Sequence, residues 1–267
     1  MAGVNARVRV TAVLLAGCLL VATAPASVAD TAPPPSDPPP TTPAPAPPVD
    51  LSETVHQIRR IGTSIEGRPI RAYRVGNPAA KVKAVVLGAI HGDETAGISV
   101  VRAIKEGSPV RGIDLWLVPT INPDGVVHRT RQNARAVDLN RNWRRGWAPL
   151  TGDYYSGTGP FSEPETEAFR DFLDEVNPRF VVSFHQPLYG IGRAHERPRF
   201  IQRLARGLRL PAREFNCSGR CHGTMTAWFN ANHGGTAVTV EFGYRPSRAY
   251  LRGRAARGTI RAVLGWR

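Results

Sequence analysis

The segment that most constrains the fold is Ala84–Glu94, with the sequence AVVLGAIHGDE. It begins as a short apolar run and ends in His91 and Glu94, three positions apart. A run this short and apolar is typical of a parallel strand covered on both faces, and it does not fit an amphipathic helix. In an open α/β sheet the carboxyl ends of the strands form the ligand-binding edge, so the segment predicts a site there.

Two later segments repeat this arrangement. Arg179–Phe184 is a predicted strand followed by His185, and Ala237–Val240 is a predicted strand followed by Glu241. Because parallel strands end at the same edge of a sheet, we expect these side chains to lie near His91. Imidazole nitrogens and a carboxylate oxygen form a ligand set that zinc accepts.

We therefore interpret His91, Glu94 and His185 as three ligands of one Zn²⁺ ion, with water in the fourth position, as in catalytic sites. Zinc bound in this way polarises a carbonyl and acidifies its water. Glu241 would accept the proton of the water and pass it to the leaving nitrogen. We expect Asp138 to accept a hydrogen bond from the outer nitrogen of a ligand histidine.

A polar segment, His128–Trp147, follows the next predicted strand and is rich in arginine and asparagine. It has too few apolar residues for a helix face, so we expect a surface loop that holds a ligand. Within it, Arg131 is available to stabilise an oxyanion. Asn140 and Arg141 are available to hold a substrate carboxylate through hydrogen bonds from a planar guanidinium fork.

The chain begins with features of an exported protein. Residues 1–29 form a predicted signal peptide, with Arg7 and Arg9 before the apolar stretch and small residues at the cleavage site. The apolar stretch is too short to span a bilayer. A lipoprotein box ending at Cys18 is the alternative, but the apolar run continues past this cysteine, which favours the signal peptide.

Residues 30–48 contain almost only Pro, Ala, Thr, Ser and Asp, which predicts an extended linker. The folded domain is therefore predicted over residues 49–267. At its start, Leu51, Val55 and Ile58 have the spacing of a short helix. Further on, Ser162–Glu165 predicts a capping box that opens another helix.

Beyond the signal peptide two cysteines remain, Cys217 and Cys221, and we expect a disulfide bond between them in an oxidising compartment.

The net charge of +14 implies attraction to polyanions, which outside the cytoplasm are cell-wall polymers and anionic lipid headgroups. A solvated basic surface is the alternative. We expect no nucleic-acid partner, because no recognised binding module accompanies the charge. The arginines are concentrated in the C-terminal third, at Arg197, Arg199, Arg203, Arg206, Arg209, Arg213, Arg245, Arg248, Arg252, Arg254 and Arg257.

Taken together, the motifs resemble those of the zinc carboxypeptidase family. They are H-x-x-E at His91–Glu94, NPDG at Asn122–Gly125, VDLNRNW at Val137–Trp143, GPFSEPET at Gly159–Thr166, and the two strands that end in His185 and Glu241. The resemblance implies an α/β fold with a central, mostly parallel or mixed, twisted sheet flanked by helices, and one zinc ion per chain. It also implies that Arg131 matches the family's carbonyl-polarising arginine, and that Asn140 and Arg141 match its carboxylate-binding pair.

The chain departs from the digestive carboxypeptidases in three respects. Asn216–Thr226 contains no tyrosine where those enzymes use a tyrosine on a mobile loop, Asp93 replaces an arginine, and the domain is shorter. These features are similar to the bacterial murein-peptide amidase branch, which cleaves a γ-D-glutamyl–diaminopimelate bond. We expect Gly223–Trp228, which contains no acidic residue, to line the pocket for the terminal residue.

We predict a secreted, monomeric zinc metallocarboxypeptidase that hydrolyses the C-terminal amide bond of short peptides with a free carboxylate, including peptides from the cell wall. One alternative is an N-acyl amino-acid deacylase of the aspartoacylase type, which shares H-x-x-E. The NPDG and SEPET motifs argue against it. A second alternative is a non-catalytic wall-binding protein, which the loss of a ligand or of Glu241 would have favoured.

Overall fold

The computed structural model of the chain describes residues 55–193, 197–215 and 219–265. The predicted signal peptide, the predicted linker and Cys18 lie outside these residues, as does Cys217. Cys221 is in a disulfide bond. Among the described helices, none is both long enough and apolar enough to cross a membrane.

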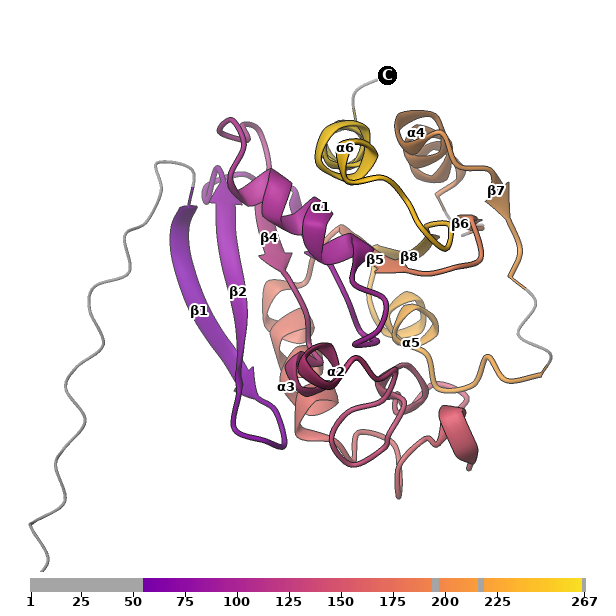
Figure 1. The fold of residues 1–267 in the computed structure, drawn as a ribbon. Helices are drawn as coiled ribbons and strands as arrows, with labels where there is room; N and C mark the ends of the chain where they lie inside the picture. The colour runs from indigo at the N-terminus through magenta and orange to yellow at the C-terminus, as the bar shows by residue number, and fades with distance from the viewer. Residues whose placement is uncertain (1–54, 194–196, 216–218, 266–267) are drawn as a thin grey trace, which may run out of the picture. The chain divides into compact units, whose positions relative to one another are not determined.

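The described chain alternates between strands and helices (Figure 1). The strands are β1 (Val55–Thr63), β2 (Pro69–Gly76), β3 (Lys83–Leu87), β4 (Asp114–Val118), β5 (Phe180–His185), β6 (Gly190–Gly192), β7 (Ala212–Arg213) and β8 (Thr236–Glu241). The α-helices are α1 (Ala96–Lys105), α2 (Pro123–His128), α3 (Pro164–Val176), α4 (Pro198–Leu208), α5 (Met225–Asn232), α6 (Arg248–Tyr250) and α7 (Ala256–Leu264). Short 3₁₀ turns form η1 (Leu139–Arg141) and η2 (Gly152–Tyr154), and η3 (Leu251–Ala255) is a π-helical turn between α6 and α7.

All the strands join one eight-stranded sheet in the order β1-β2-β4-β3-β5-β8-β6-β7. The four central strands β4, β3, β5 and β8 are parallel, while β1, β2 and β6 run antiparallel to their neighbours towards the centre. After β3 the chain goes to one side to form β4, and β5 is then added on the other side of β3. This reversal of strand order opens a crevice at the carboxyl ends of β3 and β5, where α/β proteins bind ligands.

The central strands are buried because helices cover both faces of the sheet. Alternate residues of each strand point to opposite faces, so Val86 joins one apolar cluster while Val85 and Leu87 join the other. Helices α1, α4 and α7 contribute to the first cluster, and α3 and α5 contribute to the second. Figure 1 shows α1 in front of the sheet and α3 behind it. The predicted mixed α/β sheet flanked by helices is confirmed.

The helix predicted at the start of the domain is wrong. Val55 and Ile58 lie in strand β1, which pairs with β2 through a hairpin closed by the Ser64–Arg68 turn. Leu51 lies outside the described residues. The spacing of three and four residues resembled a helix, but the β-branched residues of this segment find partners across the strand pair, and this pairing decides the structure.

The predicted capping box at the start of α3 is also absent. Helix α3 begins at Pro164 without a side-chain cap. The Glu165 carboxylate instead accepts hydrogen bonds from the backbone nitrogen of Ile65 and from the side chain of Asn133. Asn133 also donates to Glu163, and its Oδ1 accepts from two backbone nitrogens of its own loop. The SEPET motif therefore anchors the polar loop to the helix.

Helix α1 is seated closely on the sheet through Gly97. A Cβ atom at this position would collide with the carbonyl oxygen of Gly88, after β3, and with the side chain of Phe184 in β5. Alanine normally stabilises a helix by about 0.5–1 kcal/mol relative to glycine. At Gly97 overpacking reverses the sign, so we expect Gly97→Ala to lower the free energy of unfolding by about 1–3 kcal/mol in urea denaturation.

Gly253 provides the matched control for this measurement. It lies in the helical segment η3, and the nearest atoms to an added Cβ are the guanidinium nitrogens of Arg257, at 3.7 Å. Gly253→Ala should therefore leave the unfolding free energy unchanged or raise it. An unfolding midpoint of Gly97→Ala equal to that of the parent would contradict the close seating of α1.

Candidate metal centre

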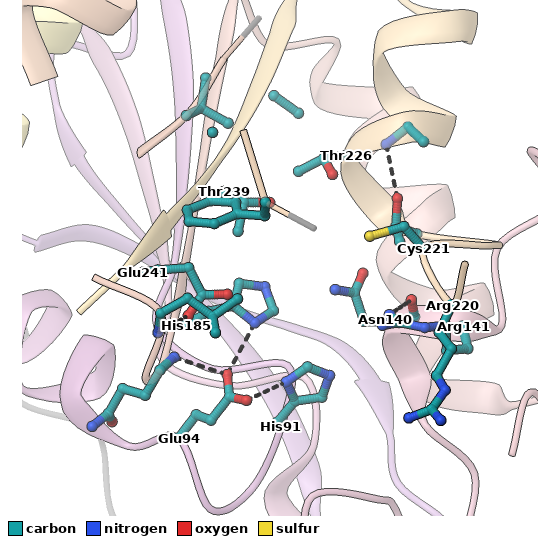
Figure 2. Close-up of a pocket in the computed structure, with 18 of the residues that line it drawn as sticks. His91, Glu94, Asn140, Arg141, His185, Arg220, Cys221, Thr226, Thr239 and Glu241 are labelled. Carbon is teal, nitrogen blue, oxygen red and sulfur yellow. Dashed lines mark hydrogen bonds and ion pairs between the residues drawn. The ribbon is translucent and has the colours of Figure 1, made fainter. Parts of the chain in front are cut away.

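Three predicted metal ligands meet at the carboxyl edge of the sheet. His91 and Glu94 lie on the loop between β3 and α1, and His185 is the last residue of β5. Each offers one ligand atom, and these atoms lie within 4.8 Å of one another. All three side chains are buried. Figure 2 shows the Glu94 carboxylate between the two imidazole rings, with hydrogen bonds to both.

The donor atoms of these residues fit a zinc ion. His91 Nδ1 lies 2.8 Å from Glu94 Oε1, and His185 Nδ1 lies 3.0 Å from Glu94 Oε2. Two ligands on a tetrahedral zinc ion with bonds of about 2.0–2.1 Å are roughly 3.3 Å apart, which is close to these separations. The backbone nitrogen of Gln186 also donates to Glu94 Oε2, at 3.1 Å, and fixes the carboxylate. The residues can therefore hold zinc with little movement.

The charges at the site are strongly coupled. Burial alone would lower the pKa of His91, but the carboxylates of Glu94 and Asp138 overcome it and raise this pKa to about 9. Burial alone would raise the pKa of Glu94, but the two histidines lower it well below its usual range. Both shifts show that the two carboxylates attract positive charge to this position, which a metal ion can supply.

Asp138 forms hydrogen bonds with two residues of the centre, His91 and Arg131. Its Oδ1 lies 3.1 Å from His91 Nε2, so the hydrogen bond expected for this pair is present. Its Oδ2 accepts from Arg131, at 3.0 Å from Nε and 2.7 Å from Nη2. Arg131 Nη1 donates to Glu94 Oε1 at 3.2 Å. The guanidinium is thus oriented by Asp138 with one nitrogen directed to the candidate ligands.

Glu241 reaches the same edge from β8. In the parallel pairing of β5 with β8, its Cα is the register partner of His185. The side chain is buried, and Oε2 accepts a hydrogen bond from the backbone nitrogen of Leu188 at 3.2 Å. Burial raises the pKa of Glu241, an effect that the neighbouring His185 partly offsets. The carboxylate is therefore set up to exchange a proton more readily than an exposed glutamate.

Asn140 and Arg141 lie across the pocket from this group (Figure 2). Asn140 Oδ1 accepts from the backbone nitrogen of Met225, and its amide NH₂ has no acceptor among the described residues. Arg141 is buried, and its Nε has no hydrogen-bond partner among the described residues. Burial lowers the pKa of this guanidinium. A buried cation with an unpaired donor indicates a place for an anion.

These groups line one cavity of about 650 Å³. The cavity wall also contains Thr224 and Thr226, as predicted for the segment Gly223–Trp228. Four further residues that no sequence motif indicated also line this cavity: Tyr154, Arg193, Glu214 and Arg220. None of them belongs to a local motif, so only the folded chain brings them together.

Tyr154 is the most informative of these additional residues. Its ring lies 5.1 Å from the guanidinium carbon of Arg131, 5.3 Å from that of Arg141 and 5.1 Å from that of Arg220. Cations are attracted to the face of an aromatic ring at such distances. The chain lacks a tyrosine in Asn216–Thr226, yet a tyrosine from η2 lines the same cavity.

The proton on His91 makes zinc binding dependent on pH. Zinc requires a neutral imidazole, so each unit of pH below about 9 should weaken the apparent zinc affinity by up to tenfold. We expect this trend in competition titrations against a chromophoric chelator between about pH 6 and pH 9. In Asp138→Asn, the affinity should level off at a lower pH because one carboxylate charge is removed. Equal affinity throughout the range would contradict a ligating His91 with a raised pKa.

Three comparisons place the chain among known proteins. A 33% identity over 141 residues relates it to a murein peptide amidase A from Vibrio campbellii, covering 48% of this chain and 56% of the relative. An inactive metallocarboxypeptidase from Ajellomyces dermatitidis is 30% identical over 165 residues, covering 48% of this chain and 28% of that protein. The chain thus spans about half or less of these relatives.

The crystal structure of a murein-tripeptide amidase from Escherichia coli O157 has the same fold. It superposes with a TM-score of 0.65 over 83% of this chain and 97% of that chain, at 24% identity. The sequence model of the family described as zinc carboxypeptidase matches residues 51–187, which are 137 of the 267 residues. The match includes His91, Glu94 and His185. The chain therefore belongs to the zinc carboxypeptidase family.

Proposed function

We propose that the protein is a secreted, zinc-dependent hydrolase that cleaves the amide bond before the C-terminal residue of short peptides, with cell-wall peptides as the favoured substrates. One observation carries the proposal. A candidate zinc triad, a buried glutamate and a buried arginine with an unpaired donor line a single cavity of about 650 Å³. This combination suits an amide bond that lies close to a carboxylate.

In this proposal His91, Glu94 and His185 hold the zinc ion. Bound zinc polarises a substrate carbonyl and lowers the pKa of a water molecule towards about 7. Asp138 keeps the imidazole of His91 in the orientation that presents Nδ1 to the metal, through its 3.1 Å contact with Nε2. The alternative role of a purely structural zinc site is disfavoured, because structural sites use four protein ligands.

Glu241 moves the proton. Its Oε2 is anchored by the backbone nitrogen of Leu188, which leaves Oε1 to accept a proton from the attacking water and return it to the leaving nitrogen. Its raised pKa brings the carboxylate closer to the pH at which both steps are effective. Arg131 Nη1 lies on the side of the metal ligands, where it can stabilise the oxyanion.

Arg141 and Asn140 make the protein an exopeptidase in this proposal. The unpaired Nε of Arg141 and the free amide of Asn140 provide hydrogen-bond donors for a terminal carboxylate. Binding at this point would place the preceding amide bond near the candidate metal ligands. An internal peptide segment has no carboxylate to satisfy the buried guanidinium, so it would bind less tightly.

The lining of the cavity favours a substrate whose C-terminal residue carries both an ammonium and a carboxylate group on its side chain. Glu214 and Arg193, which are both exposed, line the same cavity and offer an acceptor for an ammonium group and a donor for a carboxylate. Diaminopimelate has such a side chain. The similarity to a murein peptide amidase A also favours this substrate class. The predicted signal peptide of residues 1–29 would deliver the enzyme to the cell wall.

A substrate panel tests the proposed reaction. Zinc-loaded protein is incubated with muropeptides, ordinary peptides and N-acetyl-amino acids, and the products are identified by mass spectrometry. We expect release of the C-terminal residue from muropeptides. Cleavage of the N-acetyl-amino acids alone would identify a deacylase, and binding to cell walls without any hydrolysis would identify a wall-binding protein.

Glu241→Gln is the diagnostic variant for the same panel. It should lower kcat by about 10²–10⁴-fold, because the amide cannot accept the proton, while zinc stays bound. Metal content is measured in parallel by atomic absorption. If this variant kept the parent rate, Glu241 would not be the base.

Arg141→Met tests recognition of the terminal carboxylate. Loss of a charge-assisted hydrogen bond worth about 1.5–3 kcal/mol should lower kcat/KM by roughly 10- to 150-fold for peptides with a free C-terminus. C-terminally amidated peptides should be little affected. Arg145→Met is the matched control, because Arg145 is exposed on the same loop and does not line the cavity. An equal loss for both classes of peptide would assign Arg141 to another role.

A further inference from the structure

A second cavity of about 400 Å³ lies between α4 and the helical segment formed by η3 and α7. The two elements approach closely at Gly207 and Gly258, where an added Cβ on either residue would collide with the backbone of the other. This contact brings arginines from both elements to the same groove. Apart from the two glycines, the groove is lined by arginines alone: Arg203, Arg206, Arg254, Arg257 and Arg261.

The positive charges in this arginine groove are not neutralised. None of its five guanidinium groups forms an ion pair with a carboxylate within the described chain. Among the described residues, Arg203 Nε donates a hydrogen bond to the carbonyl oxygen of Ala262, at 2.9 Å, and the Arg203 guanidinium carbon lies 5.9 Å from the centre of the Phe200 ring. Other surface arginines do have carboxylate partners, including the pairs Arg59–Glu175, Arg170–Asp171 and Arg252–Glu106.

This arrangement opposes the stability of the helices. Arg254, Arg257 and Arg261 are spaced at three and four residues, where like charges face each other on a helix and destabilise it. Burial lowers the pKa of Arg203, and repulsion from Arg179 and Arg206 lowers it further. A bound anion would relieve this repulsion at several guanidinium groups at once.

We propose that the arginine groove binds a linear polyanion, a chain that carries phosphate or carboxylate groups at regular intervals. Arg254 and Arg261 are seven residues apart, or roughly 10 Å along a helix, so the arginines form a row that suits successive anionic groups. Guanidinium groups form paired hydrogen bonds with both phosphate and carboxylate, so the row accepts either chemistry.

The lining of the groove distinguishes this ligand from two others. A site that binds a membrane surface has apolar side chains beside the basic ones. The large apolar side chains that are exposed in the described chain all lie outside the groove: Val127, Leu188, Tyr189 and Tyr244. Single-stranded nucleic acid would be met by aromatic side chains that stack on bases, and no aromatic residue lines the groove. A polyanion without bases or acyl chains fits best.

The arginine groove is separate from the metal centre. The two cavities share no lining residue. Polyanion binding by the arginine groove is therefore independent of the hydrolysis proposed for the metal centre. If both hold, the groove keeps the enzyme on the polymer network where its peptide substrates lie.

Binding is measured by calorimetry on the full chain, with sodium polyphosphate as the phosphate probe and polygalacturonate as the carboxylate probe. Arg206→Glu combined with Arg257→Glu reverses two exposed charges in the groove. Arg71→Glu combined with Arg111→Glu changes the net charge equally at two exposed positions elsewhere. We expect the parent and the control to bind at least one probe, and the groove variant to bind it at least tenfold more weakly.

Binding by the parent should weaken as salt is raised, because the guanidinium groups displace counterions from the polymer. Equal affinity of the two double variants would overturn the proposal, since only net charge would then matter. So would the absence of binding to both polymers, or tighter binding to phosphatidylglycerol vesicles or to oligothymidylate. Zinc binding of both variants should match that of the parent, and the unfolding midpoint of neither should fall below it, because Arg206→Glu with Arg257→Glu relieves the repulsion in the groove. These controls separate loss of the groove from loss of the fold.

Discussion

The arrangement of the site depends on one buried carboxylate, that of Glu94. It accepts hydrogen bonds from two imidazoles and from the backbone nitrogen of Gln186. A carboxylate buried without such partners would be expensive in free energy, so these hydrogen bonds hold the loop after β3 and the end of β5 together. Gln186 strengthens the link, because its side chain accepts a hydrogen bond from the first backbone nitrogen of α1, that of Ala96. Protein hydrogen bonds therefore contribute to fixing the geometry of the candidate ligands.

The two sides of the cavity are positioned by different means. His185 and Glu241 come from paired strands, so the register of β5 with β8 fixes their separation. Asn140 and Arg141 come from an irregular loop, which needs anchors of its own. Asp138 provides one, through hydrogen bonds between its backbone nitrogen and Tyr155 and between its side chain and Asn140. A loop held by buried polar hydrogen bonds can be as well defined as a strand, and the Nε of Arg141 is an exception that stays without a partner among the described residues.

The difference between paired strands and an irregular loop explains which parts of the site the sequence could predict. The strands and the residues that follow them were predictable because short apolar runs identify buried strands, and parallel strands deliver their ends to one edge. Tyr154 was not predictable, because its neighbours are two arginines of the polar segment and Arg220, sixty-six residues further along the chain, and no local motif links them. The capping box failed for a related reason. Glu165 has the right local spacing, but Asn133, thirty-two residues earlier, offers its carboxylate a buried partner.

Two sets of arginines in this basic chain differ in how their charge is balanced. Arg131 at the metal centre is balanced by two carboxylates, so its charge is part of a preorganised site. The arginines between α4 and α7 have no such balance, although the close contact of Gly207 with Gly258 forces them together. Net charge alone does not distinguish these cases, because it counts every cation equally. The distinction lies in whether a neighbouring carboxylate has already satisfied the guanidinium, since only an unsatisfied group gains free energy from a new anion.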